Sequence, residues 1–236
     1  MIHIVSDTST LLSTKQGKEH NITITPLNVT IGNRSYHELD EIDTKGFLEL
    51  LKNNDIPMSS QPSIGEKMEI YEELARDGDI LDITMADGLS GTYASACNAR
   101  QESTYAQRIT VFNSKTLCGP HRYLVLKAVQ LASQGKSIDD IVSELQYSVD
   151  REKSFLIPCD FAATIGGMLK VVPVMTLTED HTRLEKFTMK RTFGKALQAI
   201  AECYKEMGVD ENYYMTVTHA DVLDQAVKVK EYLQTC

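Results

Sequence analysis

The sequence predicts an α/β protein with a largely parallel sheet. Short β-rich runs alternate with helical patterns along the 236 residues, the order in which parallel sheets are built. One apolar run, residues 80–85, passes through a turn rich in glycine and hydroxyl groups directly into a helical stretch. A hydrophobic content of 42% is enough to bury a large core, as one large domain or two small lobes.

The expected strands are runs rich in β-branched and apolar residues, at 2–5, 22–31, 80–85, 108–112, 154–158, 171–177, 183–190 and 213–218. The expected helices show helical spacing of apolar residues, at 44–53, 64–76, 92–103, 122–134, 138–150, 193–206 and 221–233. Ser63-x-x-Glu66 and Ser137-x-x-Asp140 predict helix starts by capping. Gly78 and Gly135 follow helical stretches, where left-handed helix ends are expected.

The charged run at residues 150–153 precedes a new strand and predicts a boundary near 151–160. We therefore expect an N-terminal α/β lobe at 1–150, with most of the parallel sheet, and a mixed α/β lobe at 151–236.

Composition argues against several partners. The net charge is −9, the pI is about 5.2 and no basic run occurs, so nucleic acids and anionic membrane surfaces are poor partners. No apolar run approaches the roughly 20 residues that span a bilayer, and the N-terminus resembles a first strand more than a signal peptide. The cysteines are scattered and odd in number, at 97, 118, 159, 203 and 236. We expect reduced thiols and a cytoplasmic protein without stable membrane insertion.

The most informative segment is Gly88-Leu89-Ser90-Gly91-Thr92-Tyr93, called the Ser90 turn below. It follows a predicted strand and opens a predicted helix, where free N–H groups and the helix dipole favour an anion. Ser90 and Thr92 add hydroxyl donors. An ordinary N-cap is the alternative. A second hydroxyl cluster, Ser59-Ser60-Gln61-Pro62-Ser63, here called the Ser-Gln-Pro motif, favours a binding site.

Two catalytic interpretations are weaker. Asp7-Thr8-Ser9-Thr10 follows the first strand, but position 9 is Ser, so the second carboxylate of an Asp-x-Asp phosphoryl-transfer site is absent. We expect Asp7 and these hydroxyls to cap the next segment and tie loops together, close to the ligand. A serine hydrolase needs a histidine base. Only His219 stands where such a base is expected, after a candidate strand, and nothing places it near Ser90.

Taken together, the motifs resemble those of the DegV family. The Ser-Gln-Pro motif resembles the family's Thr-Ser-Gln-Pro-Ser, and the Ser90 turn resembles its Gly-Leu-Ser-Gly-Thr-Tyr. Further matches follow in the family's order, over nearly the whole chain: Asp7-Thr8-Ser9, Asn113-Ser114-Lys115, Met168-Leu169-Lys170-Val171-Val172-Pro173-Val174, Lys190-Arg191-Thr192 and His219-Ala220-Asp221.

The resemblance implies a two-lobed, non-catalytic protein without a cofactor. Members of the family bury one long-chain fatty acid, hold its carboxylate by hydroxyls between the lobes, and present it to a separate fatty-acid kinase. Carried over to this chain, the carboxylate site comprises Ser59, Ser60, Ser90, Gly91, Thr92 and Arg191. Apolar residues beside Gly166-Gly167 are candidates for lining an acyl tunnel, namely Ile165, Gly166, Met168 and Leu169.

The chain also departs from the family pattern. The usual Gly-Gly-Arg-Ile-Ser segment is missing after Phe161, and the usual His-x-Gly-x-Gly strands are missing after Cys236. We expect that the sequence omits these segments. Asp87 replaces a usual serine and adds negative charge near the carboxylate. An enzyme or sensor that acts on a small phosphorylated or carboxylated metabolite at the Ser90 turn remains the alternative.

Overall fold

A four-stranded parallel sheet forms the centre of the first half of the chain. The computed structural model describes residues 1–52, 56–158 and 171–235, in two units, Met1–Glu152 and Lys153–Cys236. In the first unit the strand order is β2-β1-β6-β7, with every pairing parallel. The strands are β1 (Ile2–Asp7), β2 (Ile22–Thr25), β6 (Asp79–Thr84) and β7 (Ile109–Asn113). The predicted α/β class with a parallel sheet is therefore confirmed.

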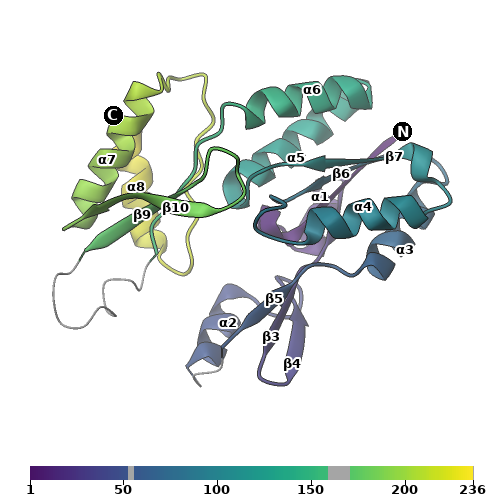
Figure 1. Ribbon diagram of the computed structural model, residues 1–236, viewed down its shortest axis with the longest axis horizontal. Coiled ribbons are helices and arrows are strands. Elements are labelled where there is room, and N and C mark those ends of the chain that lie inside the picture. Colours follow the sequence, from purple (N-terminus) through teal and green to yellow (C-terminus); the bar gives the residue numbers. More distant parts are fainter. Residues whose placement is uncertain (53–55, 159–170, 236) are drawn as a thin grey trace. The chain divides into compact units, whose positions relative to one another are not determined.

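Helices cover both faces of this sheet (Figure 1). On one face, α5 (Cys118–Ser133) and α6 (Ile138–Val149) pack on Ile4, Leu81 and Ile83. On the other, α3 (Ile64–Leu74) and α4 (Thr92–Glu102) pack on Val5 and Ile80. The short α1 (Thr14–Glu19) lies against β2. Alternate strand residues thus enter separate cores, as the two-residue period of a strand requires.

A small antiparallel sheet follows β2, in the order β4-β3-β5. It contains β3 (Asn28–Ile31), β4 (Arg34–His37) and β5 (Met58–Ser60), with α2 (Thr44–Leu51) between β4 and β5. The prediction of one strand over 22–31 was wrong. Pro26 and Leu27 separate β2 from β3, and proline supplies no N–H to a sheet ladder. The polar, exposed β4 and β5 were not predicted.

The second unit has an antiparallel sheet in the order β10-β9-β8. Its strands are β8 (Phe155–Leu156), β9 (Val172–Leu177) and β10 (Leu184–Lys190). Its helices are α7 (Phe193–Glu206) and α8 (Leu223–Gln234), and Val174 packs with Ala196, Leu197 and Ile200. The predicted strand at 213–218 was wrong, since no residue of this run belongs to a strand. Residues that favour strands form one only where a neighbouring strand supplies the hydrogen bonds.

Local signals placed the helix ends with mixed success. Ser63 with Glu66 and Ser137 with Asp140 form complete capping boxes, and Gly135 has φ 77°, so these predictions are confirmed. Gly78 is not left-handed. Instead, a Cβ there would lie 2.6 Å from the His3 ring. The α5 helix starts four residues earlier than 122, because proline is tolerated in a first helical turn.

No helix within the described residues is both long and apolar enough to cross a membrane. Cys97, Cys118 and Cys203 are free thiols.

Candidate functional site

The strand order creates a point where the chain changes direction within the sheet. From β1 it moves outward to β2, then returns to β6 on the other side of β1. In open α/β sheets, ligands bind at such switch points, outside the carboxyl ends of the strands. The segment after β1 and the Ser90 turn after β6 both leave the sheet at this edge.

Asp7 ties these two segments together. Its side chain is fully buried. One carboxylate oxygen accepts the Ser9 N–H at 2.9 Å, and the other accepts the Met85 N–H beyond β6 at 3.0 Å. The Thr10 hydroxyl donates to the Asp7 carbonyl oxygen at 2.8 Å. Asp7 therefore caps the short helix η1 (Thr8–Thr10) and bridges two loops, which is the structural role expected from the sequence.

The Ser90 turn starts α4 without a conventional side-chain cap. The N-cap residue is Gly91, which has no side chain to offer. The Ser90 Oγ accepts the Thr92 N–H at 3.3 Å and lies 2.8 Å from the Thr92 Oγ1. Thr92 is fully buried and Ser90 is half-buried. When the Thr92 hydroxyl donates to Ser90, the Ser90 hydrogen is left for an external acceptor such as a carboxylate.

The Ser-Gln-Pro motif lies next to this turn. A Cβ on Gly91 would lie 2.9 Å from the Gln61 amide, so glycine allows the close approach. The Ser95 hydroxyl of α4 donates to the Pro62 carbonyl oxygen at 2.8 Å. Ser59 and Ser60 are exposed on β5, paired with Val29 and Asn28. Gln61 therefore contacts the Ser90 turn and Pro62 contacts the first part of α4, whereas no such contact is made by the hydroxyls of Ser59 and Ser60 among the described residues.

The remaining predicted residues belong to the second half of the chain. Arg191 is exposed in the second unit, between β10 and α7. His219 accepts the Val222 N–H at 3.3 Å, a hydrogen bond to a residue three positions along the chain. The candidate tunnel residues Ile165, Gly166, Met168 and Leu169 lie outside the described residues.

His121, a fully buried side chain on α5, was not predicted as a site residue. Its Nε2 lies 3.1 Å from the Ile83 carbonyl oxygen and 3.1 Å from the Ser6 Oγ, and its Nδ1 lies 2.6 Å from the Ser9 Oγ. Burial lowers the pKa of His121 against an opposing attraction from Asp7. The only sequence clue was a histidine within an apolar helix.

Glu38 was also missed. It accepts the Thr8 hydroxyl at 2.7 Å. Burial raises its pKa, with the Thr8 hydrogen bond acting in the opposite direction. Asp7 and the hydroxyls that follow β1 therefore meet Glu38, which comes from the segment after β4.

The depressed pKa of His121 predicts a pH-dependent stability. Between the unfolded pKa of about 6.5 and the lower folded value, only the unfolded chain binds the proton. The free energy of unfolding should therefore fall as the pH drops below about 6.5, by up to about 1.4 kcal/mol per pH unit. Urea unfolding at pH 5.5 and 7.5 measures this effect.

His121→Gln should lose this contribution, and exposed His20 supplies the matched control His20→Gln. The raised pKa of Glu38 acts in the opposite direction, because it makes the free energy of unfolding fall as the pH rises above about 4.5. The test is therefore the difference in pH dependence between wild type and His121→Gln. An equal pH dependence in these two proteins would contradict the assignment.

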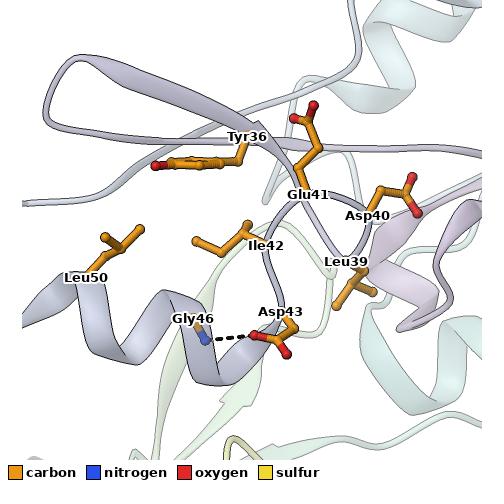
Figure 2. Close-up of a pocket in the computed structure, with 8 residues that line it drawn as sticks. All are labelled: Tyr36, Leu39, Asp40, Glu41, Ile42, Asp43, Gly46 and Leu50. Carbon is orange, nitrogen blue, oxygen red and sulfur yellow. Dashed lines mark hydrogen bonds between the residues drawn. The ribbon is translucent and has the colours of Figure 1, made fainter.

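A pocket of about 500 Å³ lies beside α2, and neither the Ser90 turn nor the Ser-Gln-Pro motif is among its lining residues. Figure 2 shows Tyr36, Ile42 and Leu50 around it, with the Asp43 carboxylate turned to the Gly46 N–H at 2.7 Å. Three of its lining residues are acidic, Asp40, Glu41 and Asp43. Like charges disfavour a bound carboxylate, so this pocket is a poor site for an acid headgroup. Across the part of the chain that the structure describes, no group of three or more His, Cys, Asp or Glu is arranged to hold a metal.

Known proteins share both the sequence and the fold. A family model for uncharacterised DegV proteins matches residues 1–236. The protein DegV of Bacillus subtilis is 31% identical over 251 residues, covering 98% of this chain and 87% of that protein. A DegV domain-containing protein of Staphylococcus aureus is 31% identical over 242 residues, covering 97% and 85%.

Solved structures agree. Bacillus subtilis DegV, reported as a fatty acid binding protein, has a TM-score of 0.82 at 29% identity, covering 99% of this chain and 88% of that one. A fatty acid binding DegV family protein from Streptococcus agalactiae shares the fold, with a TM-score of 0.84 at 23% identity, covering 100% and 88%. The whole-chain family match and the relatives at 31% identity confirm the resemblance seen in the motifs, and the chain belongs to the DegV family.

Proposed function

We propose that this protein binds one long-chain fatty acid and holds its carboxylate at the Ser90 turn. The observation that carries the proposal is the Ser90–Thr92 hydroxyl pair, 2.8 Å apart at the start of α4, beside the switch point of the sheet. Helix N-termini favour anions, and the Ser90 hydrogen is available to one when the Thr92 hydroxyl donates to Ser90. The reported fatty acid binding of Bacillus subtilis DegV, at 29% identity, supports the same ligand class.

The energetics suit a ligand of this kind. Burying roughly 15 methylenes at about 0.8 kcal/mol each gives on the order of 12 kcal/mol before ordering costs. The tail thus supplies affinity, and the hydroxyls need only orient and select the headgroup. Ser59, Ser60 and Arg191 are proposed as further carboxylate partners on the strength of their family motifs.

Extraction of the purified protein with organic solvent, followed by mass spectrometry, tests the proposal. A co-purifying fatty acid in near-stoichiometric amount supports the carrier. Protein that contains no lipid and takes up no added fatty acid contradicts it, and turnover of a small phosphorylated or carboxylated metabolite would favour an enzyme.

Ser90→Ala should weaken fatty-acid binding more than it weakens folding. Losing a hydroxyl that bonds a charged group should cost about 1.5–3 kcal/mol of binding free energy, or roughly tenfold or more in Kd. Titration with a fluorescent long-chain fatty acid measures the change. Ser133→Ala is the matched control, since Ser133 is exposed at the end of α5 and donates only to the Gln130 carbonyl oxygen. A Kd within twofold of wild type would remove Ser90 from the site.

We further propose that the bound acid is presented to a separate fatty-acid kinase, as the family resemblance implies. The sequence contains no Gly-x-x-x-x-Gly-Lys loop for a nucleotide, and phosphoryl transfer depends on positioning by such groups. Loaded protein incubated with ATP and magnesium should yield acyl phosphate only when such a kinase is added. Trapping with hydroxylamine and mass spectrometry measures the product, and acyl phosphate formed without the kinase would overturn the carrier role.

A further inference from the structure

Ser9 and His121 form a hydroxyl–imidazole pair that carboxylate binding at the Ser90 turn does not use. Ser9 belongs to η1 after β1 and is half-buried. His121 belongs to the N-terminal part of α5 and is fully buried. The Ser9 Oγ lies 2.6 Å from the His121 Nδ1.

The neighbours of His121 determine which nitrogen carries its proton. The Ile83 carbonyl oxygen lies 3.1 Å from Nε2 and can only accept, so Nε2 holds the hydrogen. A neutral imidazole has one N–H, which leaves a lone pair on Nδ1. The Ser9 hydroxyl therefore donates to Nδ1, the arrangement in which a histidine withdraws the proton of an attacking serine.

A buried carboxylate completes the pair. The Asp7 Oδ1 lies 4.0 Å from the His121 Nδ1, and both side chains are fully shielded from solvent. Asp7 favours the imidazolium that forms when the Ser9 proton moves, as does Asp82, whereas Lys67 opposes it. Asp7 also fixes Ser9 through its backbone N–H at 2.9 Å.

The first turn of α5 supplies a favourable field for developing negative charge. The N–H groups of Cys118 and Gly119 open the helix, and such groups have no intrahelical partner. The N-cap, Leu117, makes no side-chain capping bond. Positive potential at this helix end favours an oxyanion formed near His121.

We propose that Ser9 is an acyl acceptor, activated by His121, for acyl groups carried on a leaving group that departs as a stable anion, such as an acyl phosphate or a thioester. The Ser9 Oγ bonds to the carbonyl carbon and its proton passes to the His121 Nδ1. The carbon–oxygen or carbon–sulfur bond breaks, and phosphate or thiolate leaves with the electron pair. The imidazolium then loses its Nδ1 proton to solvent past Ser9, which is only half-buried.

The burial of His121 sets the substrate class. A fully enclosed imidazole does not reach an outer leaving group to protonate it, so the leaving group must depart unprotonated. A free fatty acid has no such group and is not a substrate. The acylated serine should accumulate, because the Ser9 Oγ occupies the position beside the enclosed His121 Nδ1 where a hydrolytic water would have to be activated.

The test uses p-nitrophenyl laurate and, separately, acetyl phosphate with the full chain. Wild type should gain one acyl group, mapped to Ser9 by peptide mass spectrometry and stable to neutral hydroxylamine, unlike a cysteine thioester. Ser9→Ala should lose the label, and His121→Gln should slow labelling by about 10²-fold or more. Ser35→Ala, at an exposed serine of β4, should label like wild type.

The pH profile separates activation from chance reactivity. A neutral His121 should sustain the labelling rate below pH 6.5, because its pKa is depressed, whereas an unassisted serine should show a rate that rises with hydroxide. Labelling confined to other residues, or unchanged in Ser9→Ala, overturns the proposal, as does an unlabelled but folded wild type. If His121→Gln fails to fold, Ser9→Ala and the pH profile decide. Solvent extraction of the same preparations reports fatty-acid binding independently, so each proposal can fail alone.

Discussion

Replacing Lys67 with methionine is expected to destabilise the first unit by about 3–5 kcal/mol. Lys67 and Asp82 are both completely buried, and the Lys67 Nζ lies 2.6 Å from the Asp82 Oδ2. The Tyr71 hydroxyl donates to the same oxygen at 2.5 Å, and burial beside Asp82 raises the pKa of Tyr71, so it remains a donor. The other Asp82 oxygen is buried and has no hydrogen-bond partner among the described residues. Without the lysine, a buried carboxylate loses its cation.

Urea unfolding followed by circular dichroism measures this loss, which should also lower Tm by about 10 °C. Lys127→Met is the matched control, because the Lys127 ion pair with Glu144, at 3.2 Å, is partly exposed and should contribute about 1 kcal/mol or less. Lys67→Met combined with Asp82→Leu removes both charges and should recover most of the stability. If Lys67→Met is as stable as the double variant, leaving the buried Asp82 carboxylate without Lys67 is not the cause of the lost stability.

This ion pair shows where sequence reasoning stops. The helix predicted at 64–76, observed as α3 at 64–74, followed from spacing and from the Ser63 capping box, which are local signals. A lysine within it is normally a solvent-facing residue. Its burial depends on Asp82, fifteen residues away on a neighbouring strand, and no local pattern predicts that pairing. The wrong strand predictions have the same cause. The sequence did not predict β4 and β5, which form, and it predicted a strand at 213–218, which does not form. Pairing with a neighbouring strand decides whether such a segment becomes a strand.

The candidate site was predictable to the same extent. The Ser90 turn lies at a strand-to-helix junction, as its residues indicated. The contact between Gln61 and Gly91 joins motifs thirty residues apart, and only the resemblance to a family had linked them. His121 was overlooked because its partners Ser6, Ser9 and Ile83 come from η1 and two strands. Its chemistry exists only after the sheet has formed.

Asp7→Ala is expected to destabilise the first unit by about 2–6 kcal/mol, from about 1–3 kcal/mol for each of two N–H groups left without an acceptor. These are the N–H groups of Ser9 and Met85, bonded at 2.9 and 3.0 Å. Asp7→Asn keeps one acceptor oxygen and should lose roughly half as much. Asp43→Ala is the matched control, because Asp43 accepts the Gly46 N–H at an exposed helix start and should cost about 1 kcal/mol.

The measurement should follow the Met85 amide by hydrogen exchange as well as global unfolding. In Asp7→Ala this amide should exchange faster than in Asp7→Asn, since its bond to Asp7 ties the β6 end to β1. Fatty-acid content should fall in the same order, because the Ser90 turn departs from that strand end. Exchange at Met85 unchanged from wild type would show that the two loops are held together by other contacts. Loss of bound acid without faster exchange would instead place Asp7 among the groups that act on the ligand directly.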